Sequence, residues 1–165
     1  MGSIAVIVGG GPLDPLRPPL DGPFDLVIAA DSGIGHAWAA GLRVDLLVGD
    51  LDSVSDDDLR AARAAGIEID EHPADKDATD TTLAFTHAVR RANGSITDLV
   101  VFGPGTMDRL DHQLGTIVAL GDDALDVFER VTARLGDTVV HAIHPGHRVR
   151  LEMAPGETFS LLALH

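Results

Sequence analysis

The amino-acid sequence predicts an α/β protein, with a mostly parallel, Rossmann-like sheet that carries helices on both faces and is followed by a partial antiparallel domain. Two observations lead to this prediction. Short runs of β-branched and other apolar residues alternate about five times with helical segments, as expected when crossover helices join parallel strands. After residue 130 this alternation stops, and short strands separated by Gly and Pro turns take its place.

The apolar runs of the first part are short and are followed by glycine or acidic residues, which is typical of buried parallel strands. We expect these strands at residues 4–8, 26–30, 44–48, 67–69 and 99–102. Helices are expected at residues 35–40, 55–66, 79–92 and 110–120, and residues 12–23, with five prolines, should form an irregular loop. Ser55, with Asp58 three residues later, indicates the N-terminus of the second helix.

The last part of the chain predicts short strands joined by tight turns. The strands are expected at residues 131–135, 138–144, 149–153 and 158–164, with turns at 136–137, 145–146 and 155–156. We therefore divide the chain into an α/β domain, residues 1–136, and the beginning of an antiparallel domain, residues 137–165, that is cut short at the end of the sequence.

Composition excludes several classes of protein. The net charge of −14 argues against binding to nucleic acid or to an anionic membrane, which are both recognised by basic patches. No apolar run reaches the roughly 18 to 20 residues that a bilayer span needs, and the first residues lack a signal-peptide pattern, so we expect a cytoplasmic protein. Because the chain has no cysteine, any metal must be held by oxygen or histidine ligands.

Acidic residues follow four of the predicted parallel strands, at the carboxyl ends where open α/β sheets bind ligands. They are Asp31, Asp50, Asp52, Asp75, Asp77, Asp80, Asp108 and Asp111. Asp50 and Asp52 are two residues apart, and in an extended segment such side chains point to the same side, so both carboxylates can face one cation. A turn beside a helix cap is the alternative interpretation of this pair.

Asp77 and Asp80 flank the predicted start of a helix, where an acid commonly caps the free backbone amides. Lys76 beside them adds a positive charge, and a helix start with an adjacent lysine can hold phosphate oxygens. The sequence thus leaves two interpretations open, helix caps or a phosphate site.

Arg109, Asp111 and His112 lie at the start of the following helix, after a glycine loop at residues 103–105. A guanidinium can grip a phosphate through two N–H groups, while an acid beside it orients it or takes a metal. A surface ion pair is the alternative for Arg109 and Asp111, and a structural hydrogen bond is the alternative for His112.

Taken together, these segments resemble the motif series of the thiamine pyrophosphokinase family, in the same order and at similar spacing. The segments are residues 30–33 (Ala-Asp-Ser-Gly), 49–53 (Gly-Asp-Leu-Asp-Ser), 76–80 (Lys-Asp-Ala-Thr-Asp) and 109–114 (Arg-Leu-Asp-His-Gln-Leu). The resemblance covers roughly residues 4–120, and residues 155–162 resemble the start of the β-sandwich domain of that family.

The resemblance implies transfer of the diphosphate of ATP to the hydroxyl of thiamine, with Mg²⁺ as cofactor, giving thiamine diphosphate and AMP. The implied metal ligands are Asp31, Asp50, Asp52 and Asp80. The implied nucleotide contacts are Ser32, Gly33, Lys76, Asp77, Thr79, Arg109, Asp111 and His112. The implied catalytic residues are Asp50, Asp52, Asp80 and Arg109. It also implies a homodimer whose thiamine site lies between the catalytic domain of one subunit and the sandwich of the other.

The sequence departs from the family pattern at a few positions. Met107 and Asp108 replace two glycines before the arginine, and Thr116 replaces an asparagine. Three other functions therefore remain open: a diphosphokinase for another alcohol such as a hydroxymethylpterin, a metal-dependent phosphate hydrolase, and a non-catalytic ATP-binding sensor.

Overall fold

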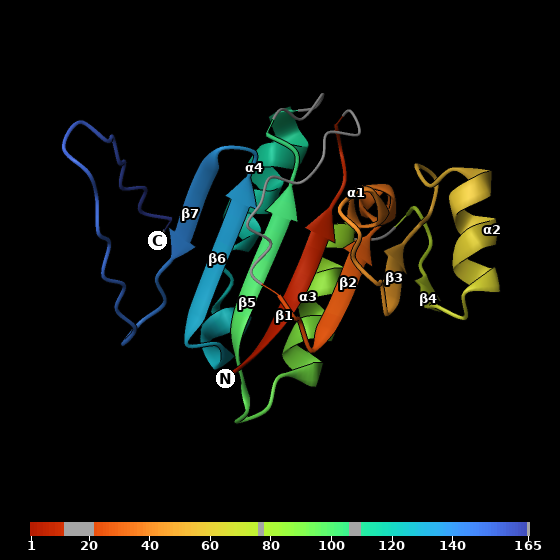
Figure 1. Ribbon diagram of the computed structural model, residues 1–165, viewed down its shortest axis with the longest axis horizontal. Helices are drawn as coiled ribbons and strands as arrows, with labels where there is room; N and C mark the ends of the chain where they lie inside the picture. Colours follow the sequence, from red (N-terminus) through yellow and green to blue (C-terminus); the bar gives the residue numbers. More distant parts are fainter. Residues whose placement is uncertain (12–21, 76–77, 106–109, 165) are drawn as a thin grey trace.

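A computed structural model describes residues 1–11, 22–75, 78–105 and 110–164. Within these residues a seven-stranded sheet runs through the centre of the molecule in the order β4-β3-β2-β1-β5-β6-β7 (Figure 1). Its strands are β1 (Gly2–Val8), β2 (Leu26–Ala30), β3 (Leu46–Gly49), β4 (Glu68–Glu71), β5 (Ile96–Gly103), β6 (Arg130–Leu135) and β7 (Thr138–Ala142). The strands from β1 to β6 are parallel and β7 is antiparallel to β6, which confirms the predicted mostly parallel sheet.

Helices cover both faces of this sheet, as predicted. They are α1 (Gly33–Ala39), α2 (Asp56–Ala64), α3 (Asp80–Arg91), α4 (Leu110–Ala119) and the short 3-10 helix η1 (Asp123–Val127). One core lies between the sheet and α3 and η1, and a second lies between the opposite face and α1 and α2. Figure 1 shows α3 and α4 behind the sheet.

The central strand β1 explains why two cores form. Its side chains alternate between the faces: Ile4, Val6 and Val8 enter the core beneath α3, whereas Ala5 and Ile7 enter the core beneath α1. All five are at most 2% exposed. A strand buried on both faces has to be apolar throughout, and this produces the continuous apolar run in the sequence.

The order of the strands places a ligand site at the end of β1. The chain moves outward from β1 to β4 on one side and then returns to β5 on the other side of β1. In open α/β sheets such a reversal leaves a crevice at the carboxyl ends of the neighbouring strands. The glycines at residues 9 and 10 follow β1 directly into this region.

The C-terminal part differs from the sequence prediction. The hairpin turn at residues 136–137 forms as expected, but β7 extends the central sheet, and residues 143–164 contain no strand. The strands predicted at 149–153 and 158–164 are therefore wrong in this structure. The helix η1 was not predicted either. The domain boundary at residue 136 stays a prediction.

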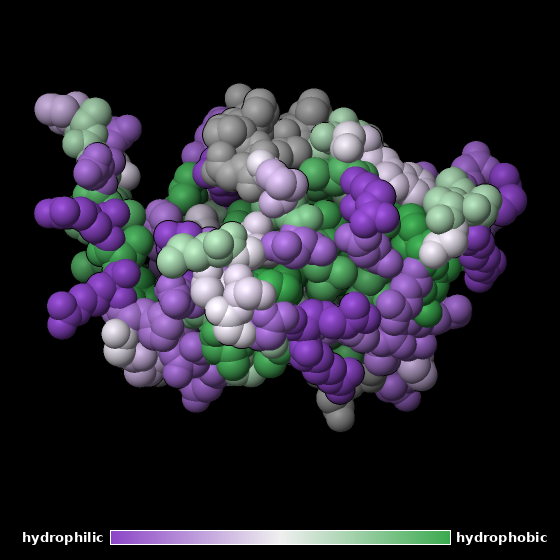
Figure 2. Space-filling view, turned by 60° about the horizontal axis from the view of Figure 1, so that its bottom comes forward, coloured by the Kyte–Doolittle hydropathy of each residue, from purple (hydrophilic) through white to green (hydrophobic). Residues whose placement is uncertain are grey.

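The physical reason is that strands need partners. A hairpin is stable only when further strands or a helix cover its apolar face, and residues 149–164 pair with no strand in the described chain and are all exposed. Apolar side chains of this segment are consequently exposed, including Phe159 at 61% and Leu161 at 87%. Figure 2 shows the segment standing away from the body, with hydrophobic residues open to the surroundings.

No helix in the described part of the chain has the length and apolar character needed to cross a bilayer.

Gly33 allows α1 to lie directly against β1. A Cβ atom at this position would lie 2.1 Å from the backbone oxygen of Ile7, so a Gly33→Ala variant must separate helix and strand. We expect it to lower the free energy of unfolding by about 2–3 kcal/mol, measured by urea denaturation. Gly94→Ala, where a Cβ meets nothing within 4 Å, is the matched control. Equal stability of the two variants would contradict the close packing.

Candidate active site

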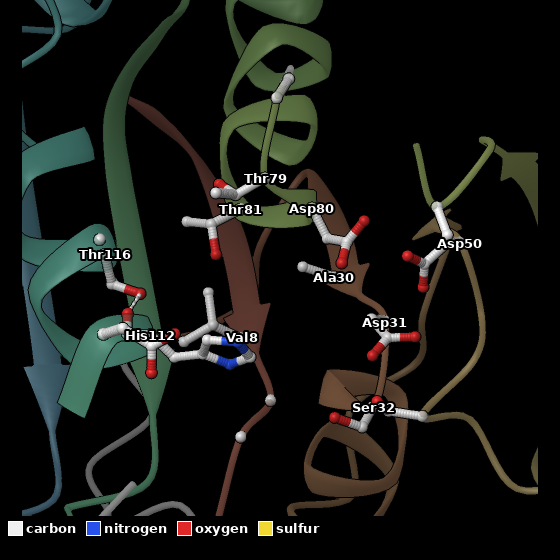
Figure 3. A pocket seen from close by; sticks show the side chains of 17 residues that line it. Val8, Ala30, Asp31, Ser32, Asp50, Thr79, Asp80, Thr81, His112 and Thr116 are labelled. Atoms are coloured by element: carbon white, nitrogen blue, oxygen red, sulfur yellow. Dashed lines mark hydrogen bonds between the residues drawn. The ribbon is translucent and has the colours of Figure 1, made fainter. Parts of the chain in front are cut away.

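A pocket of about 400 Å³ opens at the carboxyl ends of the central strands, where the sequence predicted a site (Figure 3). Its walls come from the ends of β1, β2 and β3 and from the starts of α3 and α4. The lining residues are Val8, Gly9, Gly10, Ala30, Asp31, Ser32, Asp50, Ser53, Ala74, Ala78, Thr79, Asp80, Thr81, Asp111, His112, Gly115 and Thr116.

Carboxylates crowd at one end of this pocket. Asp31, Asp50 and Asp52 each offer an oxygen, and these oxygens lie within 4.8 Å of one another. Asp80 adjoins them, because a Cβ atom placed on Gly49 would lie 3.1 Å from Asp80 Oδ1 and 3.2 Å from Asp31 Cβ. In Figure 3 the side chains of Asp31, Asp50 and Asp80 turn toward a common space. The structure thus brings together the four acids that the sequence proposed as metal ligands.

The backbone of the β3 loop brings Asp50 and Asp52 together in a way that the sequence did not predict. Leu51 has a positive φ of 63° and is 8% exposed, so the segment is turned rather than extended. The backbone N–H of Asp52 donates to Asp50 Oδ1 at 3.3 Å. The expected extended conformation is therefore wrong, although the two carboxylates do converge.

Strained backbone recurs on the neighbouring strand. Asp31, directly after β2, has a φ of 47°, which is costly for a residue other than glycine. Such conformations persist only where the surrounding structure holds them, and they concentrate at functional sites. In this protein two such residues, Asp31 and Leu51, lie in adjacent loops of the same pocket.

The electrostatics of Asp31 fit a bound cation. Burial raises the pKa of Asp31; a hydrogen bond from the Ser32 backbone lowers it, but the carboxylates of Asp80, Asp50 and Asp52 raise it further, so that the net shift is upward. Asp31 Oδ1 is buried and accepts no hydrogen bond from the described residues. A divalent cation with oxygen ligands would relieve both the repulsion and the unmet hydrogen-bonding capacity, and such donors suit Mg²⁺.

The start of α3 forms a second wall. Thr79 is the N-cap residue, and its Oγ1 accepts a hydrogen bond from the backbone N–H of Thr82 at 3.2 Å. Asp80 is the first residue of the helix and faces the carboxylate cluster, so the cap is Thr79 rather than an acid. Lys76 and Asp77, also predicted as site residues, lie outside the described residues.

The first turns of α4 form the third wall. Thr116, 4% exposed, donates from its hydroxyl to the backbone oxygen of His112 at 3.0 Å. A Cβ atom on Gly10 would lie 3.5 Å from His112 Nδ1, so the glycine loop after β1 approaches this histidine. Arg109 lies outside the described residues.

The pocket both adds to and departs from the predicted set. Thr116 was not predicted to line it, although its position one helical turn after His112 was a usable signal. Ser32 does line the pocket, whereas Gly33 is buried against the backbone of β1 and is not among the lining residues.

The fold and the pocket together define an open α/β protein with a carboxylate-rich site at the carboxyl ends of its central strands. Residues 23–126 match the family model for the thiamin pyrophosphokinase catalytic domain. This chain therefore belongs to the thiamin pyrophosphokinase family, which confirms the resemblance found in its motifs. No curated protein matched the chain.

Solved structures agree with this assignment. A thiamin pyrophosphokinase family protein from Enterococcus faecalis is 28% identical, with a TM-score of 0.63, over 81% of this chain and 61% of that one. Thiamine pyrophosphokinase from Bacillus subtilis is 29% identical, with a TM-score of 0.62, over 80% and 60%. The enzyme from Candida albicans, at 13% identity and a TM-score of 0.64 over 83% and 59%, shows the fold alone. The chain spans about three-fifths of the length of these proteins.

The raised pKa of Asp31 makes a testable prediction about stability. A raised folded-state pKa means that the contribution of Asp31 to stability is fully present below its ordinary value of 3.8 and is lost as the pH rises through the folded value. In the presence of a chelator, Asp31→Asn should therefore melt a few degrees higher than the parent chain at neutral pH. This difference should shrink as the pH falls toward 3.8.

Asp123→Asn, a substitution at an exposed position outside the pocket, is the control for the general effect of removing one negative charge. A melting-temperature difference for Asp31→Asn that stays constant with pH, or that has the opposite sign, would contradict the electrostatic analysis.

Proposed function

We propose that this chain carries the catalytic part of a thiamine pyrophosphokinase, which transfers the diphosphate of ATP to the hydroxyl of thiamine and releases AMP. The observation that carries the proposal is the convergence of Asp31, Asp50 and Asp52 beside Asp80 at the carboxyl ends of the strands. Asp31, Asp50 and Asp80 line the pocket, and Asp52 lies exposed beside them. The family assignment and the order of the motifs support it.

In this proposal the four aspartates hold Mg²⁺, which when bound neutralises phosphate oxygens and stabilises a phosphoryl-transfer transition state by several kcal/mol. Ser32, Thr79, Asp111 and His112 line the same pocket and are proposed to contact the nucleotide. Gly33, Lys76, Asp77 and Arg109 remain proposed nucleotide contacts on the strength of the motifs.

The reaction requires little covalent chemistry from the protein. The hydroxyl oxygen of thiamine attacks the β-phosphorus of ATP, and the bond from that phosphorus to the oxygen bridging to the α-phosphate breaks. AMP leaves with that oxygen, and the hydroxyl proton passes to a pocket carboxylate or to water. Asp31 is our candidate for the carboxylate, because it lines the pocket directly after β2. The protein's main contributions are therefore positioning and charge stabilisation.

We propose that thiamine, the acceptor, binds mainly to other parts of the protein than this pocket. We propose that residues 137–165 begin the thiamine-binding β-sandwich domain and that the enzyme acts as a cytoplasmic homodimer. The exposed apolar side chains of residues 149–164 are consistent with a segment that packs against further structure.

The first test is AMP formation from ATP and Mg²⁺, with and without thiamine, on the 165-residue chain and on any longer form. We expect AMP only when both thiamine and Mg²⁺ are present. AMP formation with a hydroxymethylpterin instead of thiamine would indicate another acceptor. Phosphate release without an acceptor would indicate a hydrolase, and ATP binding without turnover would indicate a sensor.

The second test removes one pocket carboxylate at a time. Asp50→Asn keeps the size of the side chain and removes a charged oxygen ligand, so we expect kcat to fall at least about 100-fold, which corresponds to a loss of about 2.7 kcal/mol of transition-state stabilisation. Asp52→Asn should also lower kcat severely. The melting temperature in a chelator should not fall in either variant, and Asp123→Asn should keep full activity. Both pocket variants retaining most of their activity would refute the metal assignment.

A further inference from the structure

A second cluster of metal-ligating side chains lies outside the pocket, where β4 meets α3. Asp70 belongs to β4, His72 follows this strand directly, and His87 lies on α3. The Nε2 atoms of both histidines point to the same oxygen, Asp70 Oδ2, at 3.0 Å from His72 and 2.6 Å from His87. All three residues offer ligand atoms that lie within 4.8 Å of one another.

The secondary structure explains how these residues meet. Alternate residues of an extended segment share a side, so Glu68 and Asp70 both face α3. Residues four apart on a helix are also neighbours, and α3 presents Arg91 to Glu68 at 3.3 Å and His87 to Asp70. Glu68 with Arg91 is an ordinary exposed ion pair. Asp70, in contrast, contacts two histidines, His72 and His87, whereas an ordinary ion pair has one partner.

This set of three has the composition of a transition-metal site. Two imidazoles and one carboxylate are typical Zn²⁺ ligands, and they usually leave a fourth position for water. Bonds of about 2.0 Å in a tetrahedral site separate ligand atoms by about 3.3 Å, so the two observed contacts would have to lengthen by less than about 1 Å. The side chains are 30%, 39% and 15% exposed for His72, Asp70 and His87, so an ion can reach them from solvent.

The protonation state of the carboxylate is suitable. Burial alone would raise the pKa of Asp70, but hydrogen bonds from His87 and His72 and the charges of both rings outweigh it and leave the pKa below its ordinary value. Metal binding requires an ionised carboxylate and two neutral imidazoles, so Zn²⁺ would take the place of any proton that these three groups share.

We propose that Asp70, His72 and His87 form a binding site for a divalent transition-metal ion of the Zn²⁺ type, separate from the carboxylate cluster of the pocket. The carboxylate cluster of the pocket, with oxygen ligands alone, suits Mg²⁺, whereas this nitrogen-containing site suits Zn²⁺. Its ligands come from a strand and a helix, so a bound ion joins β4 to α3 and stabilises the folded chain. The proposal does not depend on the reaction that the pocket catalyses.

The test is calorimetric titration of the chelator-treated chain with Zn²⁺ in a large excess of Mg²⁺, which occupies the pocket carboxylates. We expect one Zn²⁺ per chain and a higher melting temperature when it is bound. His72→Gln, His87→Gln and Asp70→Asn should each weaken Zn²⁺ binding at least tenfold. Co²⁺ as a probe should show the visible absorption of a nitrogen-containing site, and this absorption should be lost in His87→Gln.

Two matched controls separate the site from its surroundings. Arg91→Gln removes the neighbouring ion pair on the same helix, and His141→Gln removes an exposed histidine of β7; both should bind Zn²⁺ as the parent chain does. Zn²⁺ binding that survives His72→Gln and His87→Gln but is lost in Asp50→Asn would place the ion in the pocket and overturn the proposal. An absence of Zn²⁺ binding in excess Mg²⁺ would reduce the cluster to a hydrogen-bond network and would equally overturn it.

Discussion

Electrostatic repulsion among carboxylates is the main constraint that the fold has to meet at its site, because it opposes bringing the aspartates together. Asp31, Asp50 and Asp52 lie within a few ångströms of one another beside Asp80, and the pKa of Asp31 is raised first by its burial and then by the charges of these neighbouring carboxylates. The cost is offset elsewhere, chiefly by burial of apolar side chains on both faces of the sheet. Such a site is suited to a cation, because an ion between the carboxylates is attracted to each of them and reduces their mutual repulsion.

The backbone around the site also helps to bring the carboxylates together. Gly33 lets α1 approach β1, and Gly49 lets the end of β3 approach Asp31 and Asp80. Leu51 accepts a left-handed conformation because its apolar side chain is buried beneath the loop, which leaves Asp50 and Asp52 on either side of it facing the cluster. Close packing and local strain therefore position the carboxylates in a way that side-chain rotations alone would not achieve.

The two parts of the chain differ in how much of their apolar surface is buried. The α/β part buries its strands and closes a pocket, whereas residues 143–164 expose much of their apolar surface. The chain spans about three-fifths of the length of the related structures. The described residues form the pocket in which we propose that the nucleotide binds.

The sequence by itself determined the parallel strands, the helices between them and the resemblance to the family, because buried parallel strands must be apolar and because their carboxyl ends bring residues of different loops to one edge. That rule placed Asp31, Asp50, Asp52 and Asp80 among the acids at this edge, and the resemblance to the family singled them out as metal ligands. Only the tertiary structure decided the turn at Leu51, the unpaired tail and the meeting of Asp70 with His87, which lie 17 residues apart. Strand pairing and contacts between a strand and a helix depend on partners distant in the chain, and local sequence patterns do not encode them.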